Sequence, residues 1–192
     1  MASELGHVTA SQTVGPYYLI GLDWGEDGKY AFAPDTPGLF KVYGYVIDGN
    51  GDPIPDSLIE TWQADADGRF DHPDDPRGVV ARDGRSGTGF GRSNSDEDGG
   101  WSVFTVKPGT FPDADGNTEA PHLIVHVFAR GMLAGITTRI YFEDEAEANA
   151  ADPVLARVPE DRRDTLIAKK TEDGYRLDIH VQGAEETVFF DV

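Results

Sequence analysis

The chain has 192 residues, enough for one domain with its own core, and its 39% hydrophobic and 10% aromatic residues exclude a disordered polypeptide. Its 16 basic and 35 acidic residues give a net charge of -19, which disfavours nucleic acids and anionic membranes as partners because both bind through clustered cations. The absence of cysteine excludes disulfides, thiolate metal sites, iron–sulfur clusters and a cysteine nucleophile.

The first 38 residues contain scattered Gly, Pro and Asp, a composition that predicts an extended arm. The N-terminus has neither the basic patch nor the apolar stretch of a secretory signal, and no run of 18 apolar residues follows. We therefore expect a cytoplasmic protein with an N-terminal arm at 1–38 and one folded domain at 39–192.

From residue 39 onward, segments rich in β-branched and aromatic residues alternate with acidic glycine turns. Strands are predicted at residues 39–47, 57–64, 101–106, 123–129, 135–142, 174–182 and 186–191. Helix is favoured only at 143–151 and 160–170, where Pro159 suits the first position of the second helix. Many short strands with one or two short helices predict an all-β fold, an antiparallel β-sandwich.

Several patterns that resemble functional motifs have simpler explanations. The acidic turns that begin at Asp65, Asp96 and Asp113 place glycine at their fourth position, whereas a calcium-binding EF-hand loop needs it at the sixth. No Gly-x-Ser-x-Gly elbow and no phosphate-binding glycine motif occurs. His122 and His126 face the same side of one strand, but roughly 13 Å separates them, too far to share one metal ion.

The motifs at residues 42–48, 51–54, 60–68 and 104–109 resemble, in their order and spacing, the core of the intradiol ring-cleaving dioxygenases over residues 39–192. Residues 11–17, 128–142 and 182–191 resemble the α-type chains of that family, which pair with a homologous β-type chain. The resemblance implies the β-sandwich of the intradiol type and a role in the aerobic catabolism of aromatic compounds.

Catalytic members of this family hold a non-haem Fe(III) ion with two tyrosinates and two histidines, because phenolate oxygens stabilise ferric iron. The resemblance places the two tyrosine positions at Phe70 and Phe111, and the two histidine positions at His122 and Ile124. The arginine that usually precedes the histidines falls at Glu119. The resemblance therefore implies that this chain binds no metal and is inactive alone, and that its β-type partner binds the Fe(III).

The same resemblance implies how the chain would take part in catalysis. Thr13, Gly15, Pro16 and Tyr17 of the arm, together with Arg130, would line the partner's iron pocket. The expected reaction is the O2-dependent cleavage of protocatechuate to 3-carboxy-cis,cis-muconate within a larger hetero-oligomer. In the alternative, the arm only anchors the two chains, and Arg130 forms a structural ion pair with one of the many acidic residues.

Two other functions remain open from the sequence. The chain could be a self-sufficient intradiol dioxygenase with a rearranged iron site that uses His126 and a tyrosine such as Tyr17 or Tyr141. It could also be a non-catalytic binding module of the transthyretin-like type. Iron content and co-purification with a dioxygenase chain separate these three functions.

Overall fold

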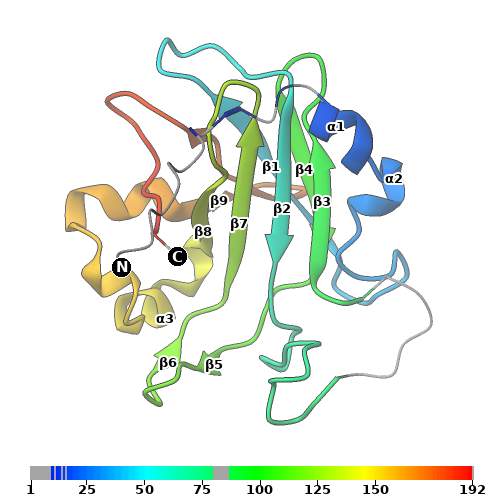
Figure 1. The fold of residues 1–192 in the computed structure, drawn as a ribbon. Helices are drawn as coiled ribbons and strands as arrows, with labels where there is room; N and C mark the ends of the chain where they lie inside the picture. Colours follow the sequence, from blue (N-terminus) through cyan, green and yellow to red (C-terminus); the bar gives the residue numbers. More distant parts are fainter. Residues whose placement is uncertain (1–9, 11, 14, 16, 80–86, 192) are drawn as a thin grey trace, which may run out of the picture.

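The computed structural model describes residues 17–79 and 87–191, together with residues 10, 12, 13 and 15 (Figure 1). Strands form most of its regular structure: β1 (Phe40–Ile47), β2 (Ser57–Trp62), β3 (Phe90–Asn94), β4 (Gly100–Thr105), β5 (Phe111–Pro112), β6 (Thr118–Glu119), β7 (His122–Ala129), β8 (Ile136–Phe142), β9 (Ile167–Lys170), β10 (Gly174–Arg176) and β11 (Ile179–His180). The prediction of an all-β fold with short helices is confirmed in this general form.

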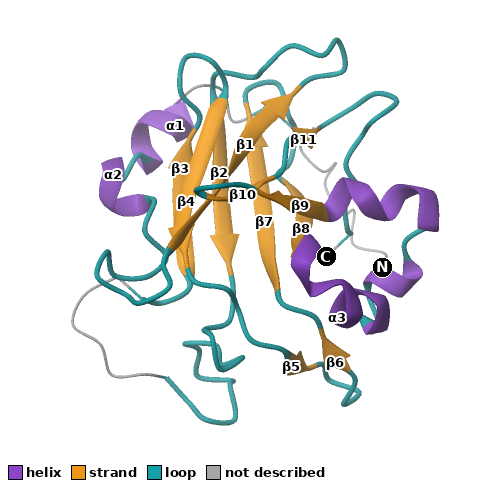
Figure 2. Ribbon diagram, turned by 180° about the vertical axis from the view of Figure 1, so that it is seen from behind, coloured by secondary structure: helices purple, strands orange, loops and turns teal. Residues whose placement is uncertain are grey.

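The helices are short and lie at two opposite edges of the sheet (Figure 2). They are the α-helices α1 (Tyr17–Leu22), α2 (Gly25–Gly28) and α3 (Ala146–Ala151), and the 3-10 helices η1 (Glu143–Glu145), η2 (Leu155–Arg157) and η3 (Glu160–Leu166). No helix in the described ranges combines the length and the apolar character needed to cross a membrane.

The sheet is mixed, so the prediction of an antiparallel arrangement is confirmed only in part. β3, β2, β7 and β8 are antiparallel neighbours, but β9 runs parallel to β8, and both β10 and β11 run parallel to β1. Parallel neighbours need a long crossover connection. Residues 143–166 supply one between β8 and β9, and the chain between residues 47 and 174 supplies the other.

The main core lies where alternate side chains of β1 and β4 meet those of β2, β7 and β8. Val42 and Val46 of β1 belong to the same buried cluster as Ile59 of β2 and Val125 of β7. Their neighbours along β1 and β7 are half-buried, as the two-residue period of a strand with one buried face requires. Burial of each such side chain contributes about 1.5–3 kcal/mol, which fixes the register of the strands.

The prediction of an extended arm at residues 1–38 is wrong for its described C-terminal part. Residues 17–28 form α1 and α2, and the ring of Trp24 stacks 3.8 Å from the Arg92 guanidinium of β3. Tyr30 stacks on Phe104 with 4.7 Å between ring centroids, and Phe32 is buried. These aromatic side chains gain more by covering the outer sheet surface than by remaining in solvent.

The sequence predictions were also wrong at several short elements. The helix expected at 160–170 is the 3-10 helix η3 followed by strand β9, and Pro159 lies just before η3. The strand expected at 186–191 is absent from the described residues except for one bridge between Thr137 and Phe190. Strands β3, β5 and β6 were not predicted.

Candidate functional site

The four positions that the resemblance assigned to iron ligands lie together at the start of β7, the strand end that is lower in Figure 1. Phe70 follows β2, Phe111 begins β5, and His122 and Ile124 occupy the same side of β7. The ring centroids of Phe70 and Phe111 are 4.8 Å apart in an edge-to-face contact, and those of Phe111 and His122 are 5.4 Å apart. The rings of Phe70, Phe111 and His122 therefore form one contiguous cluster.

A tight turn after β2 delivers Phe70 to this cluster. The Asp65 carboxylate accepts hydrogen bonds from the backbone N–H groups of Asp67 and Arg69, at 3.0 and 2.9 Å. Gly68 has φ +71, and a Cβ atom there would lie 2.0 Å from the Thr110 carbonyl oxygen. Glycine is therefore required for the turn to approach the segment that precedes Phe111.

The side chains of this cluster do not fit a ferric ion. Phe70, Phe111 and Ile124 offer no oxygen or nitrogen, so His122 is the single potential ligand among the four positions. Trp62 stacks on Phe70 at a centroid distance of 6.1 Å, so aromatic packing holds the cluster together.

His122 is buried and neutral. Its Nδ1 atom lies 2.8 Å from the Ala120 carbonyl oxygen, so this nitrogen carries the proton and donates it. Burial, with a contribution from the positive charge of Arg139, lowers the pKa of His122 from 6.5 to about 4. The second ring nitrogen, Nε2, lies 3.6 Å from the Glu119 carboxylate.

Glu119, His122 and Asp152 form a second candidate metal centre, with one ligand atom from each residue within 4.8 Å of the others. The Arg139 guanidinium already neutralises Glu119 at 2.5 Å. Asp152 accepts hydrogen bonds from the backbone N–H groups of Ala120 and Leu155, at 2.8 and 2.7 Å. The Arg139 guanidinium and these backbone N–H groups therefore provide both carboxylates with hydrogen-bond donors from the chain itself.

Tyr141 completes this buried network as a protonated phenol. Its hydroxyl donates a hydrogen bond to Asp152 at 3.1 Å, and burial raises the pKa of Tyr141 well above its ordinary value. The sequence analysis considered Glu119 only as the position where the family usually has an arginine. It did not identify Arg139 or Asp152, because nothing in the local pattern links residues so far apart in the chain.

The predicted arm residues gather at the opposite end of β7. Thr13 Oγ1 accepts a hydrogen bond from Gly131 N at 2.9 Å and one from Gly15 N at 3.3 Å. Tyr17 is 79% exposed. Arg130 Nε lies 2.9 Å from the Asp56 carboxylate, which is the ion pair that the sequence left as an alternative. Pro16 lies outside the described residues.

These arm residues are far from the chain's own ring cluster. The Tyr18 hydroxyl contacts the carbonyl of Phe128, whereas Tyr141 pairs with His122, and six residues of strand between them span about 20 Å. The rearranged iron site would combine His126 with Tyr17 or Tyr141, but Tyr141 pairs with His122, about 13 Å along β7 from His126, and the Tyr17 side chain is exposed.

Comparisons with known proteins agree with these features. The family model described as dioxygenase matches residues 14–183. The chain is 42% identical to the protocatechuate 3,4-dioxygenase alpha chain of Pseudomonas putida, with 100% of both chains covered. It is 32% identical to the protocatechuate 3,4-dioxygenase beta chain of Burkholderia cepacia, with 76% of this chain and 65% of that one covered.

Among solved structures, catechol 1,2-dioxygenase from Acinetobacter sp. ADP1 matches with a TM-score of 0.60 at 19% identity. The match covers 79% of this chain and 55% of the other. At this level of identity the similarity concerns the fold.

Proposed function

The chain belongs to the intradiol dioxygenase family, and we propose that it is the α subunit of a protocatechuate 3,4-dioxygenase that binds no iron itself. The observation that carries this proposal is the packed cluster of Phe70, Phe111, His122 and Ile124, which contains one potential ligand nitrogen. The full-length similarity to an alpha chain supports the same assignment.

In this proposal, a homologous β subunit holds the Fe(III) and the complex inserts both atoms of O2 into protocatechuate, giving 3-carboxy-cis,cis-muconate. The 32% identity to a beta chain supports a pseudo-symmetric pair, since two chains of one fold can pack in related orientations. The proposal includes an intradiol-type β-sandwich at residues 39–192, more than one αβ pair per complex, and a cytoplasmic location.

We propose further that the arm at residues 1–38 contacts the β subunit and lines its pocket through Thr13, Gly15, Pro16 and Tyr17. The high exposure of Tyr17 supports this role, and Ile20 on the same helix is 74% exposed. Exposed apolar side chains that lie close together mark protein interfaces more often than isolated ones.

The assignment is tested by purifying the chain alone and with its β subunit. Alone, it should contain far less than one ferric ion per chain and should lack the visible tyrosinate-to-iron absorption band. Together, the two chains should consume O2 with protocatechuate. If the chain alone contains one ferric ion and cleaves catechols, the assignment is wrong.

The role of Arg130 is tested in the complex with Arg130→Gln. If this guanidinium meets the substrate carboxylate, the KM for protocatechuate should rise about tenfold, while the KM for catechol, which lacks a carboxylate, should stay unchanged. Arg157→Gln, at an exposed arginine of η2, is the matched control. Equal changes in KM for both substrates would show that Arg130 acts only as a structural partner of Asp56.

A further inference from the structure

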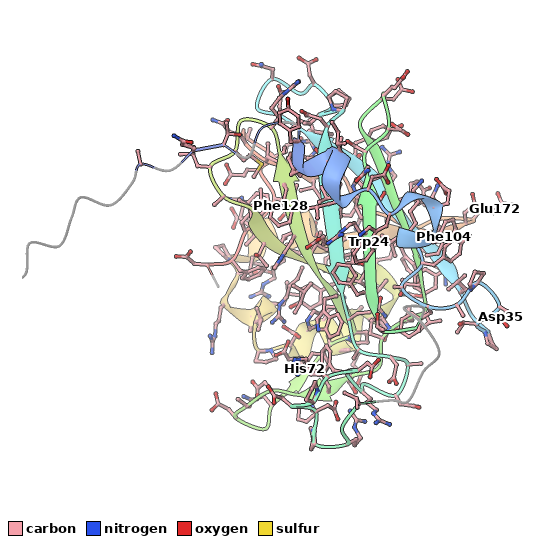
Figure 3. The ribbon with its side chains drawn as sticks, turned by 45° about the vertical axis from the view of Figure 1, so that its right-hand side comes forward. Trp24, Asp35, His72, Phe104, Phe128 and Glu172 are labelled. Atoms are coloured by element: carbon pink, nitrogen blue, oxygen red, sulfur yellow. The ribbon has the colours of Figure 1, made fainter. Side chains whose placement is uncertain are left out.

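A cavity of about 950 Å³ opens between the loop after β2 and the β5–β6 hairpin. Its apolar lining comes from Trp62, Phe70, Phe111 and Ile124, all of which are half-buried and so reach the cavity surface. Figure 3 places His72, at the rim, at the lower end of the molecule. Cavities of this size, lined mainly by aromatic and aliphatic side chains, are typical of small-molecule sites.

Hydrogen bonds hold the loop wall in place without a ligand. Arg69 Nη2 donates to the carbonyl oxygens of Arg77 and Gly78 at 2.9 and 2.6 Å. In the reverse direction, Arg77 Nη2 donates to the Gly68 carbonyl at 2.8 Å. Because two arginines bridge the loop's ends, the aromatic lining is preformed and a ligand would lose little free energy to loop ordering.

The charge at the rim restricts which aromatic molecules can bind. Arg77 is the one full cation among the described lining residues, and its guanidinium is bound to Asp75, with Nε 3.1 Å from the carboxylate. Hydrogen bonds from Arg77 hold the pKa of Asp75 well below its ordinary value, so this pair stays ionised and its charges cancel. Asp67, Asp74 and Asp113 also line the opening, where His72 Nδ1 lies 3.7 Å from the Asp74 carboxylate.

We propose that this cavity binds a small aromatic molecule that carries no negative charge, and that a positively charged substituent at the rim strengthens binding. The apolar rings receive the aromatic ring, and the carboxylates of Asp67, Asp74 and Asp113 repel benzoate-like anions. No metal takes part. This goes beyond the proposed function, because protocatechuate is an anion and belongs to the class that the rim disfavours.

The test uses the full ¹⁵N-labelled chain and three ligands that share one ring: benzylamine, benzyl alcohol and benzoate. The indole N–H resonance of Trp62 should shift during titration, whereas that of Trp101, in the core, should not. We expect benzylamine to bind about threefold to tenfold more tightly than benzyl alcohol, a difference that added salt reduces. Benzoate should bind at least about tenfold more weakly than benzylamine.

Two charge variants separate a local rim effect from the overall charge of the chain. Asp67→Asn with Asp74→Asn should bring the three affinities to within about threefold of one another. Glu172→Gln with Asp173→Asn removes the same number of charges at exposed positions, and Figure 3 shows Glu172 far from His72. This control should keep the wild-type order of affinities.

A third variant tests the location of binding. Ile124→Trp should fill the cavity floor and abolish binding of all three ligands, and an unchanged circular dichroism spectrum shows that the fold is retained. The proposal is overturned if benzoate binds as tightly as benzylamine, if none of the ligands shifts the Trp62 resonance, or if both charge variants change the order equally. Unchanged binding by a folded Ile124→Trp variant overturns it too.

Discussion

The buried imidazole of His122 predicts a specific loss of stability in acid. Burial and the charge of Arg139 lower its pKa from 6.5 to about 4, so the unfolded chain binds this proton more tightly than the folded chain does. Stability is therefore unaffected by this group above about pH 6.5 and falls as the pH drops from there toward about pH 4. The difference between the two pKa values corresponds to a loss of roughly 3 kcal/mol in the free energy of unfolding.

The perturbation that isolates this effect is His122→Asn. The asparagine amide can still donate to the Ala120 carbonyl, but it does not titrate. Urea unfolding of both proteins at several pH values should show that the wild type loses about 2 kcal/mol more than the variant between about pH 7 and about pH 4.5. The acidic residues titrate in both proteins, so their contribution cancels in the difference.

His126→Asn is the matched control, because His126 lies on the same strand but is half-buried. It should follow the wild-type dependence on pH. Parallel curves for the wild type and His122→Asn would refute the reasoning, since they would show that the folded chain accepts the proton on His122 without penalty.

Two further predictions concern the elements that hold the ring cluster. Arg139→Met leaves the buried Glu119 carboxylate without its partner and should lower the free energy of unfolding in urea by about 3–5 kcal/mol. Adding Glu119→Gln should recover more than half of this loss. A loss below about 1 kcal/mol would contradict the pairing. Gly68→Ala should cost more than about 2 kcal/mol in thermal unfolding because its Cβ would meet the Thr110 carbonyl. Gly116→Ala, with positive φ but open space, should cost only about 1 kcal/mol, and equal losses would exclude the contact as the cause.

Strands with a clear two-residue period were predictable, and segments whose partners are distant were not. The alternation at 39–47 located β1 to within one residue. The charged segment at 160–170 favours helix locally, yet Ile167 and Ala168 pair with Tyr141 and Phe142 of β8 and form a strand. Pairing across the long connection outweighs local propensity here, and a single sequence carries no record of that partner.

Only the part of the candidate site that the spaced motifs contain was predictable from the sequence. They located Phe70, Phe111 and His122, which the structure brings into contact. They gave no indication that Arg139, on a neighbouring strand, faces Glu119, because that contact depends on the register between β7 and β8 and on the path of β6. Charge patterns in a single sequence do not specify such a register.

The Arg139 guanidinium also affects how strongly the residues around His122 could bind a metal ion. Its Nη1 atom is 2.5 Å from the Glu119 carboxylate, which in turn is 3.6 Å from His122 Nε2. At an effective dielectric near 20, the Glu119 carboxylate would attract each unit of metal charge at this nitrogen by about 5 kcal/mol. The guanidinium charge lies within about 6 Å of the same nitrogen and offsets about 3 kcal/mol of that attraction.

For this reason, restoring the family's ligand residues should not by itself be enough for the chain to bind ferric iron. The triple variant Phe70→Tyr, Phe111→Tyr and Ile124→His provides two phenols and a second imidazole, but we expect little ferric iron and a weak charge-transfer band. Adding Arg139→Leu removes the repulsion and frees the Glu119 carboxylate, so iron content and band intensity should rise several-fold. If the triple variant binds iron fully, then Arg139 does not oppose a metal, and the side chains at positions 70, 111 and 124 alone decide whether ferric iron binds here.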